Sequence, residues 1–152
     1  MIFPRKVFKL LYLPVLVLIL VMFLIINGWS AWQEGVLLGA GLVLGWFLIS
    51  AYLNLIKIPQ LSLVFLSAVF QVGFLLFSFW LVISNQMLLA SGVALGVNIF
   101  FVKELIVDYQ AEDKMRLKTR LFNNINPSDR LVLTYLLVFI LLVVLLAFFV
   151  IY

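Results

Sequence analysis

Five long apolar runs divide this chain, and its polar residues lie mainly in the connections between them. The runs are Leu10–Ile26, Gly35–Leu53, Leu61–Ile83, Met87–Val107 and Leu131–Tyr152. Each is close to the roughly 20 residues that a helix needs to cross the hydrocarbon core of a bilayer. Backbone groups in lipid must be bonded within the protein, and barrel strands would be shorter and would alternate in polarity. The pattern therefore predicts an all-α integral membrane protein with five transmembrane helices, at residues 10–26, 35–53, 61–83, 87–107 and 131–151.

The composition leaves no material for a separate soluble domain. Of the 152 residues 67% are apolar and only 11% are charged, whereas soluble domains are about half apolar. We therefore expect a single membrane domain over residues 1–152, with one inner polar segment at 108–130. The first apolar run has the basic flank of a signal peptide, but it exceeds the 7–15 residues of a typical signal core. We expect it to be retained as a helix.

One orientation places every lysine and arginine on the same side of the membrane. With the amino terminus inside, all ten basic residues fall at that terminus, at Lys57 or between Lys103 and Arg130. Cytoplasmic loops carry such an excess, and aromatic residues mark both interfaces. Here Trp29, Trp32 and Trp80 fall at the outer interface, and Tyr12, Tyr52, Tyr109 and Tyr135 near the inner one. We expect an N-in, C-out protein of a prokaryotic cytoplasmic (inner) membrane, the plasma membrane of such a cell.

Two segments of the chain match each other at an offset of 51 residues. Residues 37–45 read LLGAGLVLG and residues 88–96 read LLASGVALG, with five of nine positions identical. A true duplication would make two tandem helical hairpins that enter the membrane from the same side, followed by a fifth helix. Such a parallel repeat is related by an axis along the membrane normal. The restricted alphabet of membrane helices also produces matches of this kind, and the sequence leaves both interpretations open.

Glycines four residues apart recur on the second and fourth runs. They are Gly35, Gly39, Gly41, Gly45, Gly92 and Gly96. Glycines at this spacing share one helix face and allow two backbones to approach closely. We expect the second and fourth helices to pack on each other within one subunit. A homodimer face, or the general frequency of glycine in membrane helices, would also account for the pattern.

Uncharged polar residues form stripes on the third and fourth helices. Their spacing at 100° per residue keeps those on the third helix within about 40° of one another. The predicted polar seam consists of Gln60, Ser67, Gln71, Ser78, Asn85, Ser91 and Asn98. Counting the rise per residue from the helix ends puts Gln71 and Asn98 near the midplane, so we predict a hydrogen bond between them, direct or through one water. The seam either holds two helices together or lines a narrow polar pathway.

The inner polar segment alternates cations with apolar residues. The cations are Lys114, Arg116, Lys118 and Arg120. They are expected to contact anionic headgroups at the inner face or a cytoplasmic partner, unless the segment is only a solvated connection that enforces topology. Helix and strand are both compatible with the alternation. The last helix should begin near Pro127 with Asn126 as its N-cap, and it should lie at the periphery because it is apolar all round.

The absence of two residue types limits the chemistry available to the chain. No cysteine and no histidine occurs, so disulfides, thiolate metal sites and histidine acid–base chemistry are excluded. The acids Glu34, Glu104 and Asp108 are not paired across a site, and we expect no enzyme and no cofactor. The net charge of +4 follows from topology, without nucleic-acid binding.

Two functions of different classes remain. The first is a scaffold, assembly factor or accessory subunit of a membrane complex, in contact with lipid, with itself or with another membrane protein. The second is a small oligomeric transporter or channel that uses the polar seam.

Overall fold

The computed structural model describes residues 5–28, 31–55, 66–84, 87–110, 114–122 and 127–152 of the chain. Six helices occupy nearly all of these residues: α1 (Arg5–Asn27), α2 (Trp32–Leu55), α4 (Ala68–Ser84), α5 (Leu88–Gln110), α6 (Lys114–Phe122) and α7 (Asp129–Ile151). The described part of the chain contains no strand. The fold is therefore all-helical, as the apolar pattern predicts.

Three helices are long and apolar enough to cross a membrane. They are Trp32–Leu53 with 22 residues, Leu88–Gln110 with 23 and Asp129–Ile151 with 23. Two further apolar stretches among the described residues, Val17–Asn27 and Ala68–Ser84, are shorter. The first five residues of the predicted third span, 61–65, lie outside the described part of the chain. The protein is thus a helical bundle of the integral-membrane type.

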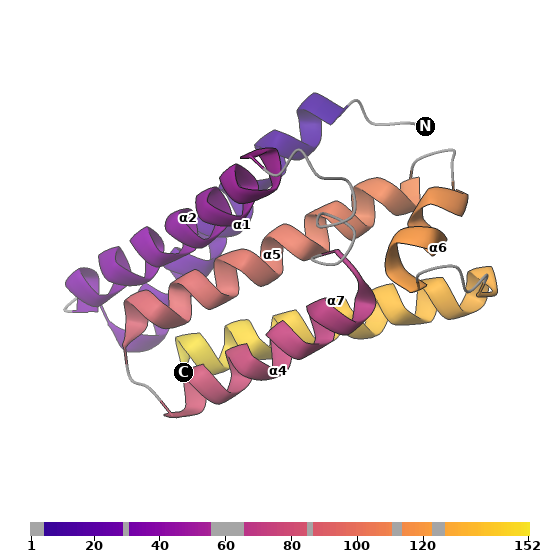
Figure 1. The fold of residues 1–152 in the computed structure, drawn as a ribbon. Coiled ribbons are helices and arrows are strands. Elements are labelled where there is room, and N and C mark those ends of the chain that lie inside the picture. The colour runs from indigo at the N-terminus through magenta and orange to yellow at the C-terminus, as the bar shows by residue number, and fades with distance from the viewer. Residues whose placement is uncertain (1–4, 29–30, 56–65, 85–86, 111–113, 123–126) are drawn as a thin grey trace.

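Helix α5 is the centre of the bundle. Ten of its 23 residues are buried, whereas α7 buries seven of 23 and α4 buries four of 17. Figure 1 shows α5 running between the pair formed by α1 and α2 on one side and the pair formed by α4 and α7 on the other. Because α5 is covered on several sides, its sequence is rich in small residues that let neighbours approach.

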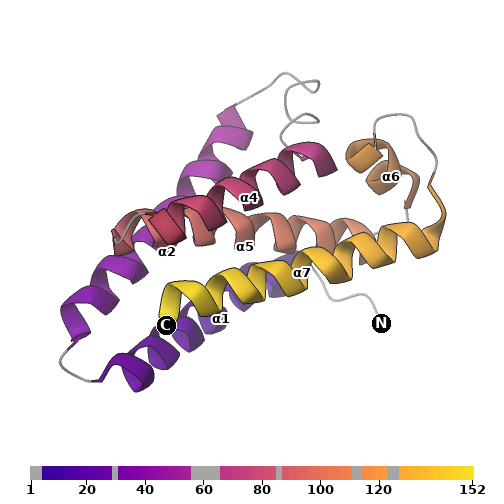
Figure 2. The same ribbon diagram turned by 90° about the horizontal axis from the view of Figure 1, so that it is seen from below.

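Helix α7 buries one narrow stripe and exposes the rest of its surface. The buried residues recur every three or four positions from Val132 through Leu136, Phe139, Val143 and Leu146 to Val150, and Ile151 follows directly. Helix α7 packs on α5, α4 and α1, and Figure 2 shows it beside these helices from below. Leu141 and Val144, on the opposite side, are more than 60% exposed. In a membrane protein such a face is presented to lipid.

The start of α7 differs from its prediction. Ser128 is the N-cap, and its side chain accepts a hydrogen bond from the Leu131 amide at 3.4 Å. The expected cap, Asn126, lies outside the described residues, and Pro127 precedes the cap instead of opening the helix. Serine caps as well as asparagine does, and the helix begins two residues later than predicted, at Asp129.

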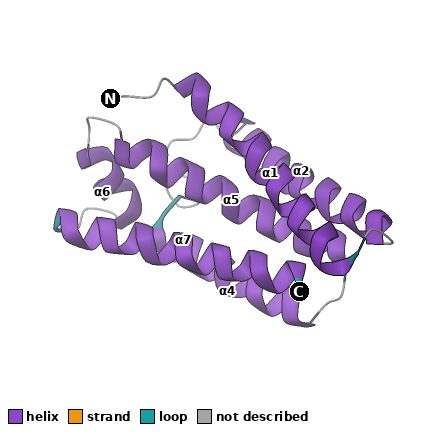
Figure 3. Ribbon diagram, turned by 180° about the vertical axis from the view of Figure 1, so that it is seen from behind, coloured by secondary structure: helices purple, strands orange, loops and turns teal. Residues whose placement is uncertain are grey.

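Helix α6 lies across one end of the bundle, at the ends of α5 and α7 (Figures 1 and 3). The alternating part of the inner segment, Lys114–Phe122, is therefore helical, which decides between the two conformations that its sequence allowed. Leu117 and Leu121, four residues apart, are 2% and 3% exposed. Phe122 packs edge-on against Tyr135 of α7, with ring centroids 6.0 Å apart. The apolar side of α6 thus closes the core at this end.

Candidate functional site

Helices α2 and α5 run in the same direction and touch backbone to backbone through glycine. A Cβ atom built on Gly92 would lie 2.5 Å from the Leu38 carbonyl oxygen, and one on Gly41, Gly45 or Gly96 would also come within 3.0 Å of backbone atoms of the other helix. Real Cβ atoms essentially never approach so closely. Only glycine therefore permits this crossing, and four of the six glycines that the sequence singled out are found in it.

The contacts at this crossing are reciprocal. Gly41 faces Leu89 while Gly92 faces Leu38, and Gly45 faces Val93 while Gly96 faces Leu42. The residue numbers of the two contacts in each pair differ by 51, which is the offset of the sequence match: position 41 corresponds to 92 and position 89 to 38. In the same way, position 45 corresponds to 96 and position 93 to 42. The two matching segments are therefore also the two surfaces that meet. A two-fold axis parallel to the helices would relate them.

The other two glycines serve a different contact. A Cβ on Gly39 would lie 3.2 Å from two methyl carbons of Leu20, and one on Gly35 would lie 3.5 Å from side-chain atoms of Phe23 and Leu24. Both glycines therefore face α1 and close the first hairpin. The spacing in the sequence did not separate them from the α2–α5 set.

Four polar side chains from three helices, three of them buried and Tyr135 partly buried, form two hydrogen-bonded pairs between helices. Asn98 of α5 donates from Nδ2 to Ser78 Oγ of α4 at 2.8 Å and to its own helix at the Ala94 carbonyl at 2.9 Å. Tyr135 of α7 donates its hydroxyl to Gln71 Oε1 of α4 at 2.8 Å. Gln71, Ser78 and Asn98 are at most 1% exposed, so water does not compete for these bonds in the folded protein.

The predicted hydrogen bond between Gln71 and Asn98 is wrong. Each amide has other partners, and Gln71 donates from Nε2 to the Leu66 carbonyl at 3.1 Å. Ser78 lies opposite Asn98 and is seven residues from Gln71, which is about 10.5 Å along a helix. Counting residues from the helix ends misjudged the register of α4 against α5.

The remaining members of the predicted seam are divided between several places. Ser91 is buried on α5, and Ser67 accepts a hydrogen bond from the Phe70 amide at 3.3 Å where α4 begins. Gln60 and Asn85 lie outside the described residues. The structure therefore pairs two members of the predicted set, Ser78 and Asn98, and pairs a third, Gln71, with Tyr135.

Tyr135 is the member that the sequence pattern missed. Its position next to the basic segment suggested an interfacial anchor, which is a common role of tyrosine. One signal was available: Tyr135 is adjacent to Leu136 and stacks on Phe139, with ring centroids 5.9 Å apart, so it borders the buried stripe of α7. A buried tyrosine hydroxyl usually finds a hydrogen-bond partner.

One acceptor in this cluster has no partner. The Oδ1 atom of Asn98 is buried and accepts no hydrogen bond from any described residue. A buried polar atom without a partner costs about 1–3 kcal/mol. This atom is therefore the one place in the described cluster where a further donor would be bound.

A separate apolar cleft runs along α5 between α1 and α7. Its volume is about 430 Å³, and side chains of α1, α2, α5 and α7 line it. At one end α1 and α7 are joined, because Asn27 Nδ2 donates to the Ile151 carbonyl at 2.8 Å. From there the two helices diverge (Figures 1 and 3). The backbones of α1 and α7 are thus farther apart toward the end where α5 finishes.

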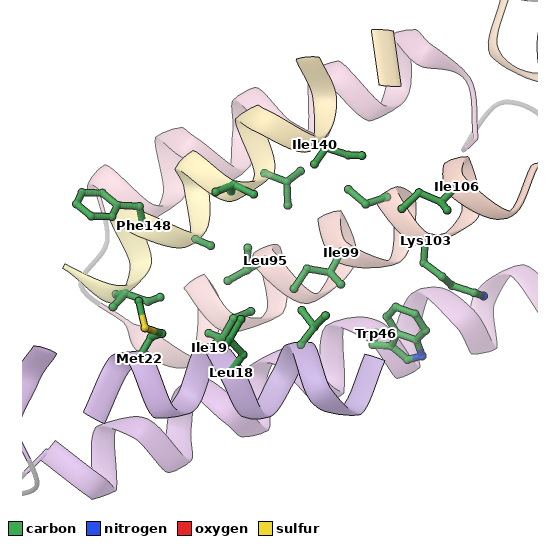
Figure 4. A pocket seen from close by; sticks show the side chains of 16 residues that line it. Leu18, Ile19, Met22, Trp46, Leu95, Ile99, Lys103, Ile106, Ile140 and Phe148 are labelled. Atoms are coloured by element: carbon green, nitrogen blue, oxygen red, sulfur yellow. The ribbon is translucent and has the colours of Figure 1, made fainter. Parts of the chain in front are cut away.

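Lys103 is the charged residue among the side chains that line this cleft. Figure 4 shows its side chain beside Trp46, with Leu95 and Ile99 further along the cleft. Its Nζ atom lies 2.6 Å from Glu104 Oε1, 5.4 Å from the Trp46 ring centroid and 5.0 Å from that of Phe100. The ammonium is therefore held by one carboxylate and two aromatic faces, an arrangement in which cation–π attraction contributes about 0.5–2 kcal/mol.

Of the four cations singled out on the inner segment, one has a described side chain. Lys118 Nζ lies 2.7 Å from Asp129 Oδ1, and the lysine side chain is 17% exposed. This ion pair ties α6 to the start of α7. The side chains of Lys114, Arg116 and Arg120 lie outside the described part of the structure.

Comparisons with protein-family models, with curated proteins and with solved structures found no match to this chain.

Proposed function

We propose that this chain is a five-span, N-in, C-out membrane protein without catalytic machinery, which acts as a scaffold, assembly factor or accessory subunit of a membrane complex. The observation that carries this proposal is the use of its buried polar groups. Asn98 of α5 bonds to Ser78 of α4, and Tyr135 of α7 bonds to Gln71 of α4. Interhelical hydrogen bonds of this kind hold helices together where the hydrophobic effect gives no help.

The parallel packing of α2 and α5 supports the proposed topology. Two helices that run in the same direction begin at the same face, so α1 and α2, and likewise α4 and α5, each form a hairpin entering from the other face. The positions of the ten basic residues favour the cytoplasm as the side from which both hairpins enter. A prokaryotic inner membrane is the compartment that this pattern favours.

The exposed surface supports a protein that contacts lipid and other membrane helices. Val69, Leu76 and Trp80 on the outer side of α4 are each at least 64% exposed, and no charged residue occurs in α4. Such a surface is compatible with lipid, with a second copy or with a larger partner. The glycine face of α2 and α5 is already used inside the subunit.

The test is crosslinking of the chain in its native membrane, followed by native electrophoresis and identification of crosslinked proteins. The proposal expects one defined complex in which a second membrane protein is present in stoichiometric amount. Recovery of the chain only as a monomer or homo-oligomer would overturn the accessory-subunit proposal and leave the membrane bundle intact.

A second candidate function, a small oligomeric transporter or channel, is favoured by one observation. The unpartnered Oδ1 atom of Asn98 offers an acceptor to a passing water or polar solute. Cysteine substitutions at Ser78 and Gln71, in this cysteine-free chain, test the pathway with a water-soluble thiol reagent. The accessory-subunit proposal expects labelling at a Glu34→Cys control alone. Labelling of position 78 would favour the transporter.

A further inference from the structure

The cleft between α1 and α7 has the length and polarity of one half of a bilayer. It extends along α5 from Leu95 to Ile106, and eleven residues of helix rise about 16.5 Å. Half of a hydrocarbon core about 30 Å thick measures about 15 Å. An acyl chain that lies along α5 would therefore span the cleft from end to end. The volume of about 430 Å³ is within the range of sites that hold one small molecule.

The cation at one end gives the cleft a direction. An ammonium group has three N–H donors, and Lys103 uses one of them for Glu104 among the described residues. Two donors remain, next to a cleft whose other labelled lining residues in Figure 4 are apolar. Lysine carries its charge on a flexible stem that reaches toward an interface. This combination fits an amphiphile with a hydrocarbon chain and an anionic head.

We propose that the cleft binds one acyl chain of an anionic phospholipid, whose phosphate is held by Lys103. The leaflet of origin rests on the proposed topology, which puts Lys103 on the cytoplasmic side. The Trp46 and Phe100 rings lie 5.4 and 5.0 Å from Lys103 Nζ, so the ammonium lies at the end of the cleft where a headgroup would enter. The closed end, where Asn27 bonds to Ile151, receives the chain terminus.

The test uses Trp46 as a reporter, because its ring lines the cleft. The other tryptophans are replaced by phenylalanine (W29F, W32F and W80F), and the protein is placed in bilayers that contain brominated phosphatidylglycerol or brominated phosphatidylcholine. Bromine quenches tryptophan on contact. The proposal expects half-maximal quenching of Trp46 at a mole fraction of brominated phosphatidylglycerol about fivefold lower than that of brominated phosphatidylcholine. This is the factor expected for one lysine–headgroup contact.

Three variants separate a site from general attraction to anionic lipid. K103Q should abolish the fivefold preference, whereas K103R should keep it. R130Q removes the same charge from an exposed position at the same end of the bundle and should also keep it. Equal quenching by both lipids in the unsubstituted protein would overturn the proposal, and so would an equal loss in K103Q and R130Q.

A second reporter distinguishes failure of this proposal from failure of the membrane placement. Trp80 is 64% exposed on the outside of α4, and a variant that keeps only Trp80 should be quenched by both lipids alike. If Trp80 is quenched and Trp46 is not, a protein segment covers the cleft and the lipid site is overturned. If neither tryptophan is quenched, the membrane placement itself is overturned.

Discussion

The glycine crossing of α2 and α5 gives the sharpest stability prediction, because the chain supplies its own control. Gly92 lies five residues into α5 and touches α2, whereas Gly73 lies six residues into α4 and has nothing within 4 Å of the place where a Cβ would stand. Replacement of either glycine by alanine adds the same methyl group at a similar helical position. The expected effects on the free energy of unfolding have opposite signs.

The magnitude follows from the distances at Gly92. The new Cβ would stand 2.5 Å from the Leu38 carbonyl oxygen, and ordinary contact begins at 3.4 Å, so the backbones must separate by 0.9 Å (3.4 minus 2.5 Å). A gap of that size forfeits about a quarter to a half of each contact's attraction, and overpacking of this kind costs about 1–3 kcal/mol. Both variants gain about 1 kcal/mol of helix propensity. This gain cancels when the two are compared.

The assay is equilibrium unfolding in mixed micelles with increasing SDS, followed by far-ultraviolet circular dichroism. G92A should have a free energy of unfolding about 1–3 kcal/mol below that of G73A, and G73A should be no less stable than the unsubstituted protein. Equal stability of the two variants would refute the claim that α2 and α5 meet at their backbones.

Three other predictions concern the polar contacts, and each is read from the same unfolding assay. A double-mutant cycle with S78A and N98A should give a coupling energy of about 0.6–1.7 kcal/mol; a coupling of zero would show that the two side chains do not interact. Tyr135→Phe should lower the free energy of unfolding by about 0.5–1.5 kcal/mol, because the buried Oε1 atom of Gln71 loses its hydrogen-bond donor. Tyr152→Phe, at a residue 86% exposed, should leave the free energy of unfolding unchanged. An equal effect of both phenylalanines would contradict the buried hydrogen bond. Ser128→Ala should cost about 0.5 kcal/mol, the low end of the range for caps, because its cap bond is long at 3.4 Å; a loss above about 2 kcal/mol would mean that Ser128 does more than cap α7.

Helix positions followed from the sequence because a single physical constraint sets them. A backbone in lipid must bond to itself, so long apolar runs become helices. The predicted runs Met87–Val107 and Leu131–Tyr152 agree with α5 and α7 to within about three residues at their ends. Small-residue spacing also pointed to contact between the second and fourth runs. The parallel direction of that contact agrees with the 51-residue match.

Contacts between helices were harder to predict, because sequence periodicity gives the face of a helix but not its register against a neighbour. Ser78 and Gln71 share one face of α4 two turns apart, and only the seating of the hairpin decides which of them meets Asn98. The partner of Gln71, Tyr135, is 64 residues away in sequence. No local pattern reports a contact of that range.

The cleft was not predictable from composition at all. Its lining comes from four helices, and apolar residues that line it do not differ in kind from those that face lipid. Lys103 was recognised as an inner cation, but its stacking on Trp46 depends on the close approach of α2 and α5. The glycines that permit this approach therefore also place the Trp46 ring beside Lys103.

The direction of the two hairpins is the central claim, and cysteine labelling of intact cells tests it most directly. Glu34 and Met87 stand near the starts of α2 and α5 and are exposed, as is Arg130 at the opposite end. With single cysteines at these positions, a membrane-impermeant maleimide should label 34 and 87 in intact cells and should label 130 only after permeabilisation. Labelling of 34 and 87 from opposite sides of the membrane would contradict the parallel arrangement of α2 and α5.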